Sequence, residues 1–174
     1  MAPVPRSLDD AGMPPALDTE EAMPGPGIRI AQFAALVLTA LALIPVGAHL
    51  AELPVKIDMA EDAYFTVQAI YSGWSRWGVA LIGAIVANLV LTIALRRQRW
   101  ASLFALAAFA LTGLTLAIFF AVIYPTNVAT ANWTIVPTDW EGLRRRWEYG
   151  HAVNAGLTFL GFCAVALATL RTRG

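Results

Sequence analysis

The only two histidines in the chain each lie three residues from a glutamate, at the end of a long apolar segment. His49 is followed by Glu52, and His151 is preceded by Glu148. Residues three apart on a helix share one face, so each pair would place a carboxylate beside an imidazole. If the two apolar segments run in opposite directions across one layer, both pairs lie at a similar depth. The sequence therefore predicts a site built from His49, Glu52, Glu148 and His151.

Several chemistries suit these four side chains, and the sequence leaves them open. Nitrogen and oxygen ligands would suit a single copper or iron ion, whereas a di-iron centre would need further carboxylates. A haem held by two histidines fits the pattern less well. A histidine could instead be a general base on an acidic carbon or phenol, with no metal. The remaining alternative is structural, because His–Glu pairs can simply join helix ends.

Other polar and aromatic side chains are expected near the two pairs, where they could contact a bound molecule. Such residues recur every three to four positions on one face of the last apolar segment and of the residues that lead into it. The candidate binding residues are Tyr71, Asn127, Trp140, Arg144, Trp147 and Asn154. Asn154 would face a shallow pocket, whereas the deeper Asn88 is expected to bond another helix. Ala152 and Gly156, four apart, predict a close helix contact.

Four apolar segments must position these residues. Hydrophobic residues make up 58% of the 174-residue chain and charged residues 14%, against about 45–50% and about 25% in soluble domains. The segments cover about 28–50, 77–95, 101–124 and 152–170, and their interiors hold no charged residue. Each is near the length of about 20 residues that crosses a bilayer. We expect an all-α, up-down bundle of four transmembrane helices in a lipid bilayer.

The two longer connections between these segments also predict helices. Asp58 and Glu61 match a capping box that would open a short extramembrane helix, ending near Tyr71. Thr138 and Glu141 predict the start of one helix of about 32 residues that includes the last span and projects from the membrane. The pairs Glu141–Arg145 and Arg144–Glu148, each four apart, would support its projecting part.

The ends of the chain and its charges suggest how it lies in the membrane. Residues 1–27 hold six of the ten prolines and five acids, a composition typical of a disordered tail and unlike a signal peptide. Residues 28–174 then form the membrane domain. Basic residues near the span ends place both termini in the cytoplasm: Arg29, Arg96, Arg97, Arg99, Arg171 and Arg173. A composition rich in Ala and Arg, with Lys56 as the one lysine, suggests a bacterial protein and hence a bacterial inner membrane. The zero net charge argues against a nucleic-acid partner.

The stretch from Asn127 to Asn154 resembles the anthrone oxygenase-like family of small four-helix membrane proteins. The motifs that carry the resemblance are Asn132-Trp133, Pro137-x-x-Trp140, Leu143-Arg144-x-Arg146-Trp147-Glu148 and His151, with weaker matches at Gly47-Ala48-His49, Glu52-Leu53-Pro54-x-Lys56 and Gln68-x-x-Tyr71-x-Gly73-Trp74. Fungal members are associated with oxidising anthrones to anthraquinones, whereas many bacterial members have no assigned activity. The resemblance thus implies an oxidoreductase that acts on a lipophilic aromatic molecule.

If that chemistry carries over, His151 or His49 would remove a benzylic proton from the substrate. Asn127 or Arg144 would steady the phenolate, and Trp140, Trp147 and Tyr71 would rim a lipid-accessible site. Two other functions are also consistent with the sequence. One is a non-catalytic accessory subunit whose long helix docks a partner, and the other is a b-type haem carrier. A homo-oligomer is left open.

Overall fold

The computed structural model of the protein describes residues 23–173. The expected disordered tail, residues 1–27, therefore lies outside the described residues except for its last five. Two of those five already belong to the first helix, which begins at Pro26. A proline suits that position because the first backbone N–H groups of a helix have no partner within the helix.

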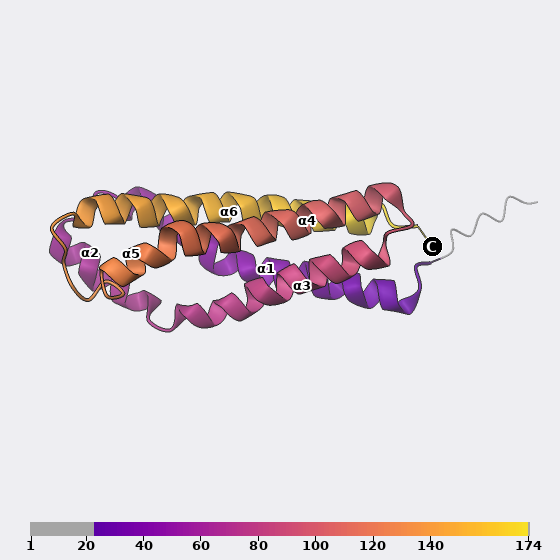
Figure 1. The fold of residues 1–174 in the computed structure, drawn as a ribbon, viewed down its shortest axis with the longest axis horizontal. Coiled ribbons are helices and arrows are strands. Elements are labelled where there is room, and N and C mark those ends of the chain that lie inside the picture. The colour runs from indigo at the N-terminus through magenta and orange to yellow at the C-terminus, as the bar shows by residue number, and fades with distance from the viewer. Residues whose placement is uncertain (1–22, 174) are drawn as a thin grey trace, which may run out of the picture.

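The described residues form helices and turns, with no strand. The helices, in chain order, are α1 (Pro26–Lys56), α2 (Glu61–Gln68), η2 (Ala69–Tyr71), η3 (Trp74–Trp77), α3 (Gly78–Ala94), α4 (Arg99–Ile118), η4 (Phe119–Ile123), α5 (Tyr124–Ala129) and α6 (Trp140–Leu170). The four long helices run lengthwise (Figure 1) and pack in a ring, α1 on α3, α3 on α4, α4 on α6 and α6 on α1. This is the predicted up-down bundle.

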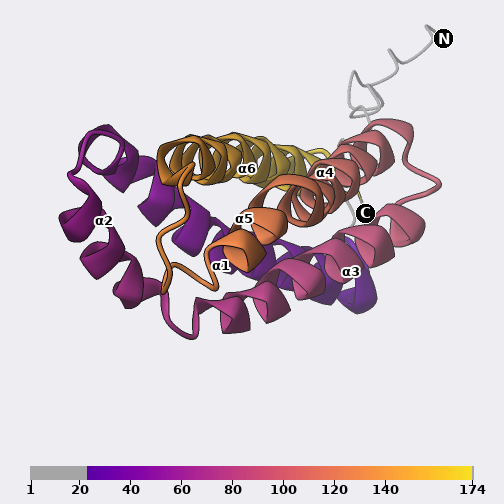
Figure 2. The same cartoon turned by 60° about the vertical axis from the view of Figure 1, so that its left-hand side comes forward.

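The two ends of the bundle differ in structure. The turned view shows the short helices α2 and α5, with the loop before α6, together at one end (Figure 2). We call this the cap end, formed by residues 57–77 and 124–139. The opposite end, the termini end, carries the start of α1, the α3–α4 turn and the end of α6. The predicted extramembrane helix between the first two spans is therefore confirmed as α2.

The bundle is apolar outside and packed with small residues inside. Ala35, Ala84, Ala105 and Ala108 are fully buried, which lets helix backbones approach closely, as is usual in membrane bundles. Large apolar side chains instead cover the outer surface, among them Ile30, Phe33, Val79, Val86, Leu103 and Phe159. Four helices are long and apolar enough to cross a membrane. The protein is a multi-pass membrane protein whose surroundings are lipid.

The starts of two helices correct details of the prediction. α2 begins at Glu61 with Ala60 before it and no side-chain cap, so the Asp58–Glu61 capping box is wrong. Acidic residues in its first turn, Glu61 and Asp62, favour the helix dipole instead. α6 begins at Trp140, and its 31 residues extend about 46 Å at about 1.5 Å each. The single long helix is confirmed, but the predicted Thr138–Glu141 capping box is wrong, because Asp139 precedes α6 and no side chain caps its start.

The third membrane crossing continues past its predicted end. A π-helical turn, η4, joins α4 to α5, which extends to Ala129. Pro125 lies just after this turn and cannot donate a backbone hydrogen bond. The Thr126 hydroxyl donates to the Val122 carbonyl at 3.0 Å, which gives this carbonyl a donor close to the proline.

Small and polar residues between the helices test two predictions. The amide of Asn88 on α3 donates to the hydroxyl of Thr39 on α1 at 3.2 Å, which confirms the interhelical bond. The predicted contact at Gly156 is wrong, since nothing lies within 4 Å of a Cβ built there. Gly161, five residues further along α6, makes the close contact instead, because a Cβ there would meet the Thr112 methyl group at 3.3 Å.

The Asn88–Thr39 bond leads to a stability prediction. Thr39→Val keeps the side-chain shape but leaves the fully buried Asn88 amide without its acceptor, so we expect a loss of about 0.6 kcal/mol, at most about 1.7. Thr92→Val is the control, because the Thr92 hydroxyl donates only to its own helix at Asn88 O. Unfolding by dodecyl sulfate in mixed micelles measures both variants. Equal midpoints for the two variants would contradict the prediction.

Candidate functional site

The two histidines meet near the cap end of the bundle. His49, from the last turns of α1, and His151, from α6, are stacked with ring centroids 4.0 Å apart and ring planes at 27°. His49 is 6% exposed, and His151 is partly buried. Both Nδ1 atoms lack a hydrogen-bond partner among the described residues. The expectation that the first and last spans bring these side chains to one level is confirmed.

Aromatic rings surround the stacked imidazoles. The His49 ring lies 4.4 Å from the Tyr71 ring and 4.8 Å from the Trp147 ring, centroid to centroid. Trp74 lies 5.6 Å from His49, and Trp147 lies 4.4 Å from His151. Tyr71, Trp74 and His151 stay partly exposed, whereas Trp147 is buried. Aromatic rings therefore line the two imidazoles, whose Nδ1 atoms have no hydrogen-bond partner in the described part of the chain.

Lys56 joins the two carboxylates that the sequence paired with histidines. Its ammonium lies 2.9 Å from Glu148 Oε1 and 4.0 Å from Glu52 Oε2, and it donates to the Tyr71 hydroxyl at 2.8 Å. Lys56 and Glu148 are 2% and 1% exposed. Lys56 is not among the site residues predicted from the sequence. Its position four residues after Glu52, on the same helix face, was the signal that could have found it.

Two tyrosines extend this polar network into the cap. The Tyr64 hydroxyl donates to Glu148 Oε1 at 2.9 Å and accepts a bond from the Gln68 amide, and the Tyr71 hydroxyl donates to Glu52. Burial, followed by the charge of Glu148, raises the pKa of Tyr64 well above its ordinary value. Burial and the bond to Glu52 raise the pKa of Tyr71 likewise. Both phenols therefore stay protonated and serve the carboxylates as donors.

Arg144 and Trp140 hold the loop between α1 and α2 in place. Arg144 Nη1 donates to the Met59 carbonyl at 2.6 Å, and its guanidinium lies 4.7 Å from the Trp140 ring centroid. Arg144 is 7% exposed. The predicted Arg144–Glu148 pair does not form among the described residues, because Glu148 pairs with Lys56 instead. The predicted Glu141–Arg145 pair forms at 3.5 Å on the exposed surface.

The two asparagines proposed to contact substrate bond other helices of the chain. Asn127 Oδ1 accepts from the indole N–H of Trp147 at 2.8 Å. Asn154, 4% exposed, donates to the Thr115 carbonyl of α4 at 3.2 Å. Asn127 thus fixes the ring that lies against both histidines, and Asn154 joins α6 to α4.

Trp133 is a further member of the site that was not predicted from the sequence, although it belongs to the Asn132-Trp133 motif. It is 7% exposed, and its ring lies 5.2 Å from that of Tyr64 and 5.7 Å from that of Trp147. Ala131, Asn132 and Trp133 have φ of 47°, 56° and 64°, a left-handed turn that costs energy in residues other than glycine. The backbone N–H of Trp133 donates to the Thr130 hydroxyl at 3.1 Å, which helps to hold this turn.

These side chains do not form a metal or haem site as they are placed. Residues 23–173 contain no group of three or more His, Cys, Asp or Glu side chains able to hold a metal ion. Lys56 lies between Glu148 and Glu52, where its ammonium supplies the positive charge that a metal would bring. The stacked rings, 4.0 Å apart, leave no room for a haem iron between them. Of the chemistries that the sequence left open, metal-free general base catalysis suits this geometry best.

The site draws its residues from α1, α2, η2, η3, α5 and α6, and from the loop before α6. No protein-family model, curated protein or solved structure matches this chain.

Proposed function

We propose that this protein is a membrane-embedded oxidoreductase of the anthrone oxygenase-like type, which uses a histidine base and dioxygen to oxidise a lipophilic phenolic aromatic molecule. One observation carries the proposal: two stacked, largely buried imidazoles whose Nδ1 atoms have no partner in the described residues. Buried polar atoms are normally hydrogen-bonded. A bound molecule with an acidic hydrogen would give one of these nitrogens its partner.

The proposed reaction needs no cofactor. One imidazole accepts a proton from the benzylic CH₂ of an anthrone, and the resulting carbanion passes its electrons to O₂, forming a C–O bond. The peroxide takes the proton back from the imidazolium. Loss of the second benzylic hydrogen and cleavage of the O–O bond then release water and leave a carbonyl. Anthrone and O₂ thus become anthraquinone and water, and the histidine ends unchanged.

Lys56 is suited to stabilise the negative charge that develops in this reaction. A preorganised positive group in a water-poor site stabilises such charge strongly. The Lys56 ammonium is held by Glu148 and Tyr71 and lies 4.8 Å from the ring centroid of Trp147, which contacts both histidines. Asn127 and Arg144 were expected to steady a phenolate, but their polar atoms bond Trp147 and Met59. We therefore assign this role to Lys56. The partly exposed Tyr71 and Trp74 would line the approach from the lipid.

The decisive experiment measures O₂ uptake and anthraquinone absorbance by the purified full chain in nanodiscs with a hydroxyanthrone. His49→Ala and His151→Ala are each expected to lower the rate by about 10²–10⁴-fold, the usual contribution of a general base. Tyr149→Phe is the matched control, because Tyr149 lies on α6 but is 54% exposed. Unchanged turnover in both alanine variants, with helical content intact, would refute the assignment.

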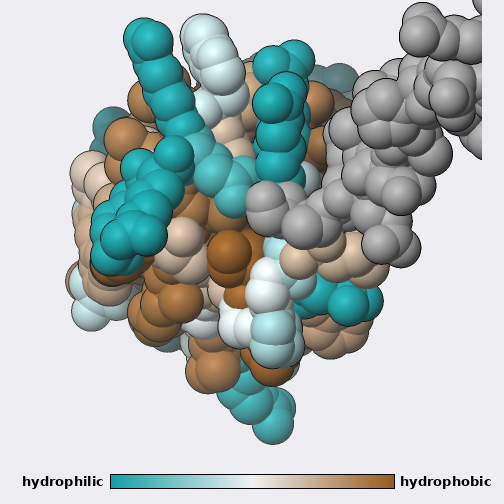
Figure 3. All heavy atoms as spheres, turned by 90° about the vertical axis from the view of Figure 1, so that its right-hand side faces the viewer, coloured by the Kyte–Doolittle hydropathy of each residue, from teal (hydrophilic) through white to brown (hydrophobic). Residues whose placement is uncertain are grey.

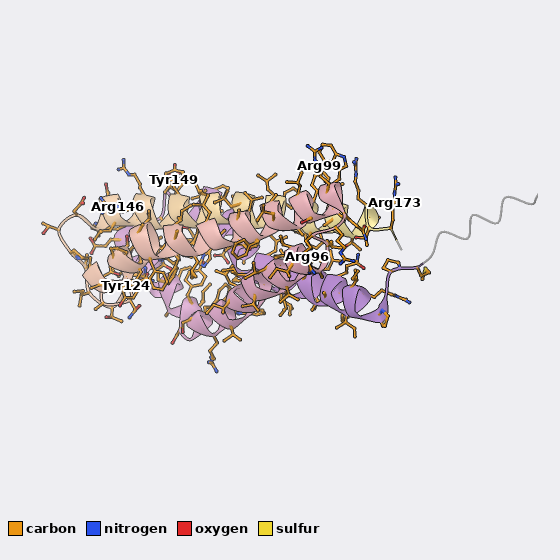
Figure 4. The ribbon with its side chains drawn as sticks, turned by 45° about the vertical axis from the view of Figure 1, so that its right-hand side comes forward. Arg96, Arg99, Tyr124, Arg146, Tyr149 and Arg173 are labelled. Atoms are coloured by element: carbon orange, nitrogen blue, oxygen red, sulfur yellow. The ribbon has the colours of Figure 1, made fainter. Side chains whose placement is uncertain are left out.

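A non-catalytic membrane subunit is the second candidate, and the polar network itself favours it. Lys56, Glu148, Tyr64 and Gln68 tie α1, α2 and α6 together whether or not a substrate binds. Trp140 and Arg144 pack inside the cap, so a partner would instead meet the outer face of α6, where Arg146 and Tyr149 point away from the bundle (Figure 4). If no turnover is found, loss of a co-purifying protein in Arg146→Glu would support this role.

A further inference from the structure

A second site lies at the termini end, where the start of α4 meets the end of α6. A pocket of about 560 Å³ opens there, lined by Gln98, Arg99, Trp100, Leu170, Arg171 and Arg173, with smaller neighbours. Figure 4 shows Arg99 and Arg173 at this end of the bundle, opposite the cap. From this pocket we propose that the protein binds the phosphate headgroup of one anionic phospholipid, independently of the chemistry at the histidines.

The pocket is built by contacts that are distant in the sequence. The Gln98 side-chain amide donates to the Arg173 carbonyl at 2.8 Å and accepts from the Arg173 N–H at 2.9 Å, across 75 residues. These two bonds hold the segment after α6 beside the α3–α4 turn. The Arg171 guanidinium lies 5.5 Å from the Phe104 ring centroid, and that of Arg99 lies 5.4 Å from the Trp100 ring centroid. Three guanidinium groups are thus gathered around one hollow.

The charge around this pocket is uncompensated within residues 23–173. Figure 3 views the termini end and shows hydrophilic side chains projecting from its rim. All acids of the described residues belong to the opposite half of the molecule: Glu52, Asp58, Glu61, Asp62, Asp139, Glu141 and Glu148. The first turn of α4 also has no side-chain cap, so its backbone N–H groups add partial positive charge. An anion is the chemical complement of this pocket, and guanidinium groups bind phosphate in a bidentate way.

Apolar surface beside the arginines indicates a lipid as the source of the phosphate. Trp100 is 58% exposed and Leu170 is 80% exposed, and both line the pocket. A tryptophan at this level is typical of a membrane interface. A free phosphate would leave both side chains uncovered, whereas the glycerol and acyl chains of a phospholipid would cover them. Basic pockets between membrane helices bind anionic lipid headgroups in this way.

Native mass spectrometry of the full chain, released from nanodiscs of palmitoyl-oleoyl phosphatidylcholine and phosphatidylglycerol in equal amounts, tests the proposal. The unmodified protein is expected to retain one phosphatidylglycerol in preference to phosphatidylcholine. Arg99→Gln combined with Arg173→Gln should lower this retention by about tenfold or more. Arg145→Gln combined with Arg146→Gln is the matched control, since it removes two exposed arginines from α6 at the other end, and it should leave retention unchanged.

Three results would overturn the inference. Equal loss in the control pair would mean that bulk charge attracts the lipid and that the pocket does not. Equal retention of the two lipids would exclude headgroup recognition. Inorganic phosphate is the additional probe. If it displaces phosphatidylglycerol and binds with the same dependence on Arg99 and Arg173, the site recognises free phosphate and the lipid assignment fails. Anthrone turnover plays no part in these readouts.

Discussion

Lys56→Met is expected to destabilise the protein by about 3–5 kcal/mol, because it leaves a buried carboxylate without its counter-charge. Glu148 is 1% exposed and lies 2.9 Å from the Lys56 ammonium. In the variant, the Tyr64 hydroxyl would be the remaining donor to Glu148 Oε1. Dodecyl sulfate unfolding in mixed micelles, followed by circular dichroism, should show the midpoint shift.

Two further variants make this prediction specific to the buried pair. Lys56→Met combined with Glu148→Met removes both charges and should recover most of the loss, since apolar replacements of a buried pair are often neutral. Arg145→Met breaks the Glu141–Arg145 pair, whose side chains are 57% and 64% exposed respectively, and should cost about 0.5 kcal/mol or less. If Lys56→Met and Arg145→Met had equal costs, the Lys56–Glu148 pair would not stabilise the fold.

Gly161→Leu is expected to destabilise the bundle by about 1–3 kcal/mol, because a larger side chain would push α6 away from α4. A Cβ at Gly161 already lies 3.3 Å from the Thr112 methyl group and 3.7 Å from the Ala108 carbonyl oxygen. Ala108 and Thr112 are both fully buried, so neither can yield without moving the helix. The same unfolding assay in mixed micelles measures the change.

Gly156→Leu is the matched control, on the same helix and with the same change of residue. Nothing lies within 4 Å of a Cβ at Gly156, and the added side chain would point to lipid. Both variants gain the same helix propensity, about 1 kcal/mol relative to glycine, so their difference isolates the contact at Gly161. A variant at Gly156 that unfolded as easily as that at Gly161 would show that this face is also packed, for example against a second copy of the chain.

The helices and their order were predictable from hydropathy, because a helix that crosses the bilayer must be apolar along the whole length that contacts lipid. The predicted spans and the short extramembrane helix all correspond to helices of the structure. The boundaries were less accurate. α1 extends to Lys56 and the third crossing to Ala129. A helix can continue into polar residues beyond the lipid, so the drop in hydropathy does not mark the end of the helix.

The sequence by itself determined that His49 and His151 come to one level, since that follows from an up-down bundle with spans of similar length. It did not determine which side chain each polar group would meet. Glu148 was expected to pair with Arg144 on its own helix, yet Lys56 from α1 takes that place, and Asn154 bonds the Thr115 carbonyl. Such choices depend on how far each helix is rotated about its axis, and only the packing of all the helices sets that rotation. Spacing along one helix fixes depth and face, whereas the tertiary structure decides the partner across the interface.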